Sequence, residues 1–259
     1  MQRKTTIIYF TSVTIALLIF ATMIILKKGY YEIESRIEKI EKVESIGENY
    51  TSLGWLRIQG TNIDYQVVKE NNGLLVYPVN KDKYVWLINE NIKDKDFIII
   101  NGHNIFNLSS KPKIKDKDFT RLESLMAFVY YNFAKKNQYI QYTVDKRNYL
   151  YKIFSVAFIN NDTMNSFISS NNSNYTKSAI KEQIDLYKEE SLYNYDIKVD
   201  QNDKIITIAT CTRFMQNKDM NFVVSGRLLR KDEKVNKTKI TKNTKVYNTI
   251  EKIMKGDEK

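Results

Sequence analysis

The chain of 259 residues contains one cysteine, Cys211, and one histidine, His103. A lone cysteine cannot form an intramolecular disulfide, and one cysteine with one histidine are too few ligands for a Cys/His zinc site. Each residue could be structural, because free cysteine is among the most buried residue types. A thiol paired with an imidazole is, however, a standard nucleophilic arrangement, and the sequence offers a single candidate pair for it.

Both residues lie at the end of an apolar run. Cys211 ends the run TIATCT at 207–212, and His103 lies in IINGHN at 99–104. A strand end that opens into a loop is where a β fold presents reactive groups to solvent. This shared position makes the two residues more informative together than either is alone.

The elements that must position the pair are mostly strands. Runs rich in Ile, Val, Tyr and Phe, separated by polar turns, predict a mainly β fold, an eight-stranded and closed or nearly closed antiparallel barrel. These runs are 54–58, 62–68, 83–88, 97–100, 139–144, 148–158, 204–210 and 221–229. Two helical insertions are expected, at 119–135 and 175–190.

Residues 7–26 form an uncharged run of 20 residues, long enough to span a bilayer as one helix. A cleaved signal peptide is the rival interpretation, but no small-residue cleavage site follows the run. The expected order is a cytoplasmic N-terminus and transmembrane anchor (1–28), an amphipathic helix and linker (29–50), one domain (51–230) and a Lys-rich tail, mostly mobile with a short helix (231–259). This order predicts a single-pass protein of the cell membrane with its domain outside the cell.

The composition excludes several classes of protein. Hydrophobic residues make up 42% and aromatic residues 12% of the chain, which is enough for a core and excludes general disorder. The net charge of +11 comes from lysines dispersed among acidic residues and asparagines. Since no nucleic-acid motif accompanies this charge, we expect no nucleic-acid partner and instead a surface suited to anionic lipid or cell-wall polymer.

The sequence around the two residues resembles sortases, the cysteine transpeptidases of Gram-positive bacteria. TIATC at 207–211, which includes Thr210, matches the family motif Thr-Leu-x-Thr-Cys with Ile for Leu, and Gly102-His103-Asn104 matches the turn with the family histidine. Residues 54–68 resemble the first strand pair of class B sortases, with Gln66 where proline is usual. The likeness covers 54–229, although the class B pattern is hard to recognise between 68 and 97.

The resemblance also implies an arginine about ten positions after the cysteine, and this chain has Asn221 there. Asn221 can donate a hydrogen bond but carries no charge, whereas Arg213 could reach the site from the loop after the cysteine. Arg227 is too distant, because six strand residues span about 20 Å. Arg213 and Asn221 are therefore the candidates for stabilising an oxyanion.

The resemblance implies that Cys211 cleaves an NPxTx-like sorting signal near the C-terminus of a secreted protein through a thioester. His103 would pair with the thiolate and protonate the leaving amine. An amine of peptidoglycan or of a lipid-linked precursor would then resolve the thioester, with no metal or cofactor. Two alternatives stay open: a hydrolytic cysteine protease, and a binding module on a sortase fold that lost activity with its arginine.

Overall fold

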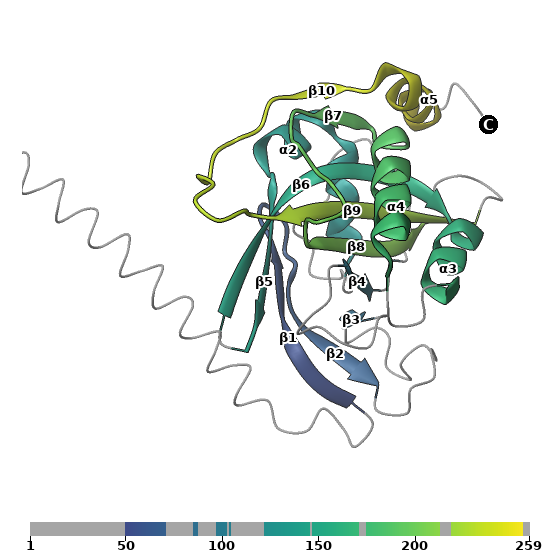
Figure 1. The fold of residues 1–259 in the computed structure, drawn as a ribbon. Helices are drawn as coiled ribbons and strands as arrows, with labels where there is room; N and C mark the ends of the chain where they lie inside the picture. Colours follow the sequence, from purple (N-terminus) through teal and green to yellow (C-terminus); the bar gives the residue numbers. More distant parts are fainter. Residues whose placement is uncertain are drawn as a thin grey trace, which may run out of the picture. The chain divides into compact units, whose positions relative to one another are not determined.

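A computed structural model describes residues 50–70, 85–87, 97–102, 104, 122–145, 147–170, 175–212 and 219–255. Within these residues the strands are β1 (Tyr50–Ile58), β2 (Asp64–Glu70), β3 (Val85–Leu87), β4 (Phe97–Gly102), β5 (Tyr139–Val144), β6 (Arg147–Asn160), β7 (Tyr193–Tyr195), β8 (Ile205–Thr212), β9 (Met220–Leu228) and β10 (Ile240–Lys242). The helices are the 3-10 helix η1 (Glu123–Val129), α2 (Tyr131–Lys136), α3 (Asn161–Ser170), α4 (Lys177–Glu189) and α5 (Thr244–Lys255) (Figure 1).

The main sheet has the strand order β1-β2-β3-β4-β8-β9-β6-β5, and β5 pairs in turn with β1. Its neighbours are antiparallel except for β2–β3 and β4–β8, which are parallel. The predicted mainly β architecture is thus confirmed. A completely closed barrel stays a prediction, because β3 is three residues long and meets β2 through two residue pairs.

Alternation along β8 separates two apolar layers. Ile206 and Ile208 belong to the inner cluster, while Ile205 and Ala209 belong to an outer cluster beneath α3 and α4. Successive strand residues point to opposite faces, so a continuously apolar strand is buried on both sides. Figure 1 shows α4 lying across β8 and β9. Cys211 shares the outer face with Ala209 by the same alternation.

Helix α4 confirms the insertion predicted at 175–190. Thr176 caps it by accepting a hydrogen bond from the backbone N–H of Ala179. Ile180, Ile184 and Tyr187 are spaced to share one helix face and are all buried against the sheet. Each such buried side chain contributes about 1.5–3 kcal/mol to folding.

The insertion predicted at 119–135 is a broken element rather than one helix. The 3-10 helix η1 ends at Val129. The next residue, Tyr130, is extended, with φ of −88° and ψ of 118°, and α2 begins directly after it. All residues of η1 are buried, so this element has no exposed face. α3 was not predicted from the sequence.

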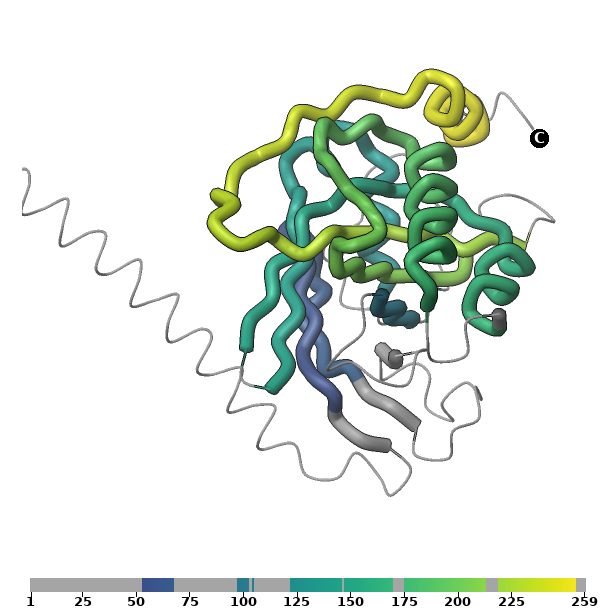
Figure 2. The backbone as a smooth tube through the Cα atoms, in the orientation of Figure 1, coloured from purple at the N-terminus to yellow at the C-terminus, as the bar shows by residue number. Residues whose placement is uncertain are grey.

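The segment after β9, expected to be a mostly mobile tail, is structured as far as Lys255. It crosses from the end of β9, pairs through β10 with β7, and ends in α5 (Figure 2). Ile240, Tyr247 and Ile250 are buried in the inner cluster, and this apolar contact holds a segment whose lysines face solvent. The domain boundaries drawn from the sequence stay predictions, and residues 1–49, with the helix expected after the anchor, lie outside the described residues.

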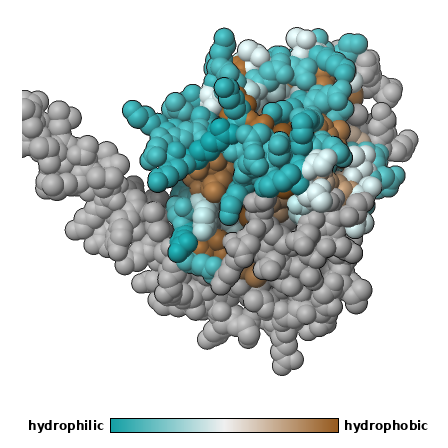
Figure 3. Space-filling view, viewed as in Figure 1, coloured by the Kyte–Doolittle hydropathy of each residue, from teal (hydrophilic) through white to brown (hydrophobic). Residues whose placement is uncertain are grey.

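The surface of the described part is mainly polar. The face seen in Figure 3 is largely hydrophilic, with hydrophobic side chains visible between the polar ones. Val235 is the one large apolar side chain classed as exposed among the described residues. Such isolated apolar residues are normal on soluble surfaces.

The predicted single-pass membrane location is corrected by the structure. Across the described ranges, from residue 50 to residue 255 with their gaps, no helix has the length and apolarity needed to cross a bilayer. The uncharged run at 7–26, on which the prediction was based, lies outside those ranges.

Candidate functional site

Cys211 is the exposed residue in an otherwise buried strand. The other residues of β8 are buried, and Cys211 alone opens to solvent one position before the strand ends. The apolar residues before it anchor the strand in both apolar layers. The thiol is therefore presented on a rigid element at the surface, and the alternative of a buried core cysteine does not fit.

The end of the adjacent strand β4 and the chain two residues beyond it are joined to this end of β8 by two side-chain hydrogen bonds. The Thr210 hydroxyl donates to the carbonyl oxygen of Gly102 at 2.7 Å. The Asn104 side-chain amide donates to the carbonyl oxygen of Cys211 at 3.2 Å. Both Thr210 and Asn104 are buried. His103 lies outside the described residues, but its two sequence neighbours are each bonded to β8 beside Cys211.

On the other side of β8, Asn221 of β9 lies directly opposite Cys211 in the antiparallel register. Directly opposed residues project their side chains to the same face of a sheet. Asn221 is 7% exposed, and its amide nitrogen donates to the side-chain oxygen of Asn161. The residue found where the resemblance expects arginine is thus next to the thiol and held by a hydrogen bond.

Two residues that the sequence analysis missed complete this arrangement. Asn161 begins α3, and its amide nitrogen donates to the carboxylate of Asp219. The backbone N–H of Asn161 also donates to the backbone carbonyl of Asp219 at 3.0 Å. The sequence carried no signal for them, because Asn161 reaches Asn221 only through the pairing of β6 with β9, in which Ile159 lies opposite Asn221.

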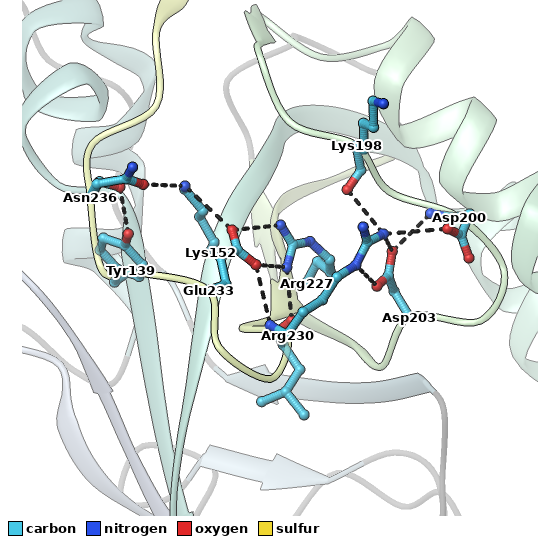
Figure 4. A network of polar contacts seen from close by, with 10 residues as sticks. Tyr139, Lys152, Lys198, Asp200, Asp203, Arg227, Arg230, Glu233 and Asn236 are labelled. Carbon is cyan, nitrogen blue, oxygen red and sulfur yellow. Dashed lines mark hydrogen bonds and ion pairs between the residues drawn. The ribbon is translucent and has the colours of Figure 1, made fainter.

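Of the two arginines considered from the sequence, the structure describes one, Arg227. Arg213 lies outside the described residues. Arg227 pairs with Ile205, at the opposite end of β8 from Cys211. Its guanidinium donates to both carboxylate oxygens of Glu233, at 2.5 and 3.0 Å (Figure 4). This guanidinium therefore belongs to a separate ion-pair network.

In the described ranges, no group of three or more His, Cys, Asp and Glu side chains is arranged to hold a metal ion. The described end of β8 and β9 offers one thiol, the amides of Asn104, Asn161 and Asn221, and the Asp219 carboxylate. These groups can supply a nucleophile and hydrogen-bond donors, which are the components of acyl transfer.

Comparisons with known proteins agree on one family. The family model of the sortase domain matches residues 56–229. Sortase B of Listeria monocytogenes is 24% identical over 208 residues, covering 77% of this chain and 76% of the relative. Sortase B of Staphylococcus aureus is 21% identical over 214 residues, covering 80% of each.

Solved structures show the same fold. Clostridium perfringens sortase B has a TM-score of 0.58 at 22% identity and covers 76% of this chain and 100% of that one. The Staphylococcus aureus sortase B–substrate complex has a TM-score of 0.57 at 18% identity, covering 79% and 94%. A sortase B complexed with triglycine has a TM-score of 0.57 at 17% identity, covering 79% and 95%.

Proposed function

Because this chain belongs to the sortase family of cysteine transpeptidases, which cleave sorting signals and transfer the product to amines, we propose that it acts on an NPxTx-like signal near the C-terminus of secreted proteins. The acceptor is an amine of peptidoglycan or of its lipid-linked precursor. Two structural relatives support this choice, because one is a substrate complex and another holds triglycine, a peptide with a free amine. The nucleophile in this proposal is Cys211.

One observation supports this most strongly: an exposed thiol at a strand end, with β4 bonded to one side of it and Asn221 on the other. In the parallel register, Asn101 pairs with Ala209. The residues on either side of position 103 in the sequence are both bonded to this end of β8, Gly102 to Thr210 and Asn104 to Cys211. His103 is therefore the proposed imidazole partner of the thiol.

The proposed reaction has two halves. The Cys211 thiolate attacks the carbonyl carbon of the threonine, and a C–S bond forms as the carbonyl oxygen takes the electron pair. Collapse of this tetrahedral intermediate breaks the C–N bond, and the His103 imidazolium protonates the leaving amine. The acceptor amine then attacks the thioester, His103 takes its proton, and the C–S bond breaks to give an amide and the free thiolate.

The oxyanion of each tetrahedral intermediate needs a hydrogen-bond donor. We assign this role to the Asn221 amide, which lies opposite Cys211 and is only 7% exposed. A donor held in a site with little water acts more strongly than one in bulk solvent. Arg213, two residues beyond the nucleophile in the sequence, is the second candidate for the same role.

Mass spectrometry of the intact protein tests the proposal. The full chain is incubated with a peptide containing Asn-Pro-Ala-Thr-Gly, with and without triglycine. We expect an acyl adduct on Cys211, absent in Cys211→Ala, and a peptide–triglycine product. Release of the free acid alone, even with triglycine, would identify a hydrolytic protease. A folded protein that forms no adduct with any Thr–Gly or Thr–Asn sorting peptide would identify a binding module.

A further inference from the structure

Three polar side chains from two separate parts of the chain are connected in a row beside Cys211. The Asn221 amide nitrogen donates to the Asn161 oxygen, and the Asn161 amide nitrogen donates to the Asp219 carboxylate. Asn221 lies in β9, Asn161 begins α3, and Asp219 immediately precedes β9. The backbone bond from Asn161 to Asp219 at 3.0 Å holds the start of α3 against this corner.

The carboxylate determines the direction of the whole row. An ionised aspartate can only accept hydrogen bonds, whereas an asparagine amide has a donating and an accepting end. Asn161 must therefore present its nitrogen to Asp219, which leaves its oxygen for Asn221. Asn221 can meet that oxygen only with its own nitrogen. The orientation of the amide beside the thiol thus follows from a carboxylate two hydrogen bonds away.

This orientation matters because an amide nitrogen carries two N–H groups. The bond to Asn161 uses one N–H of Asn221 and holds the planar amide so that the second N–H has a fixed direction. A flipped amide would present its oxygen in that place and would repel an oxyanion. Asn221 is also 7% exposed, and a buried amide that lost its partner would carry a cost in free energy.

We infer that Asn161 is a positioning residue, which together with Asp219 keeps Asn221 oriented as a hydrogen-bond donor toward the acyl oxygen on Cys211. The inference rests on the proposed function, since it assigns a role in the same acyl transfer. It also explains how a neutral residue can stand where the family resemblance expects arginine: the fixed amide direction supplies a donor where a guanidinium would supply charge.

The orientation itself is tested by NMR of side-chain amides in the full-length, nitrogen-15-labelled protein, with the Asn221 pair assigned from its loss in Asn221→Ala. We expect Asn161→Ala and Asp219→Ala to shift the Asn221 resonances. Asn165→Ala is the matched control, because Asn165 is exposed on the same helix. Asp219→Asn covers the case in which Asp219→Ala does not fold. If the Asn161 and Asp219 variants, folded, leave the Asn221 resonances where Asn165→Ala leaves them, the inference is overturned.

The catalytic consequence is tested by a double-mutant cycle on the rate of acyl-enzyme formation with the same Thr–Gly peptide. We expect Asn161→Ala to lower the maximal rate by about tenfold with little change in the half-saturating peptide concentration, as for a lost orientation of an oxyanion donor. In the Asn221→Ala background, Asn161→Ala should lower the rate no further. Independent, additive losses would indicate a structural role only and would contradict the inference.

These two experiments separate the inference from the proposed function. A wild-type protein that forms no acyl-enzyme counts against the proposed function, while the amide resonances still decide whether Asn161 and Asp219 orient Asn221. A wild-type protein that acylates normally but shows unchanged rates in folded Asn161→Ala retains the proposed function and removes the positioning role.

Discussion

The two ends of the β8–β9 pair use different chemistry within one antiparallel ladder. At the end where Ile205 meets Arg227, charged groups form ion pairs that fasten the chain after β9. At the end where Cys211 meets Asn221, the Asn221 amide is bonded to the neutral amide of Asn161, which is bonded in turn to the Asp219 carboxylate. The same strand thus carries a structural guanidinium at one end and an oriented amide at the other.

The charged end shows what a guanidinium does in this fold. Arg227 is 3% exposed and makes a two-pronged bond to Glu233, which also lies 3.6 Å from Lys152 (Figure 4). Arg230 bonds Asp203 through two nitrogens, each at 2.8 Å. A bidentate guanidinium–carboxylate pair is directional and strong. The directional bonds at the charged end hold the chain that follows β9. Those at the thiol end orient the amide of Asn221.

The largest effect is expected when the thiol of Cys211 is removed. Cys211→Ala should abolish acyl-enzyme formation, because the chain has no other thiol to serve as nucleophile. The loss should exceed about a thousandfold in turnover, with the thermal unfolding midpoint close to wild type because the side chain is exposed. The acyl adduct is measured by mass spectrometry, and an adduct persisting in this variant would refute the assignment.

The second effect tests the neutral donor. Asn221→Ala should lower the rate of acyl-enzyme formation by about a hundredfold, the usual range for removing one oxyanion donor. Single-turnover kinetics measures it, with Asn165→Ala as control. A rate unchanged by this variant but lost in Arg213→Ala would move the oxyanion role to Arg213.

The third effect is expected when the ion pair between Arg227 and Glu233 is removed. Arg227→Met should lower the free energy of unfolding by about 3 kcal/mol, because it leaves Glu233 without its main partner. Acylation per folded molecule should not change, since Arg227 lies at the other end of β8. The matched control is Lys181→Ala, which removes an exposed ion pair with Asp185 and should cost no more than about 0.5 kcal/mol. Urea unfolding compares the two, and equal costs would contradict a buried role for Arg227.

The smallest effect is a pH dependence confined to the charged end. The hydrogen bond from Arg227 is the main cause that lowers the pKa of Glu233 to about 2. A carboxyl whose folded-state pKa is depressed stabilises the protein above its unfolded pKa, near 4.3, and this contribution is lost as the pH falls toward 2. Glu233→Gln should therefore lower stability at pH 7 and flatten its decline between pH 5 and pH 2. If the stability of wild type and of Glu233→Gln declines equally between pH 5 and pH 2, Glu233 is not a cause of this pH dependence.

The sequence predicted those parts of the molecule that depend on local pattern. The apolar run before Cys211 and the run before His103 predicted β8 and β4, and the helical insertion expected at 175–190 corresponds to α4. Composition and spacing predict such elements because the two strands are apolar on both faces and the helix on one. The motif residues Thr210 and Asn104 prove to join the two strands.

Features that depend on distant partners were not predictable. Asn161 and Asn221 are 60 positions apart, and no spacing rule connects them. The tail was expected to be mostly mobile because lysines dominate its composition. Tyr247 and Ile250 are nevertheless buried in the inner cluster, among residues that are distant in the sequence. The break at Tyr130, between η1 and α2, was likewise not predicted from the sequence.

The bond from Thr210 to Gly102 has a consequence for how the protein matures. The two residues are 108 positions apart in the chain, and parallel strands such as β4 and β8 can pair only through a long connection. Such non-local contacts form late, because the entropy of closing the intervening loop must be overcome first. In the nascent chain the Cys211 thiol and the segment that ends at Gly102 are therefore separate until β4 and β8 pair.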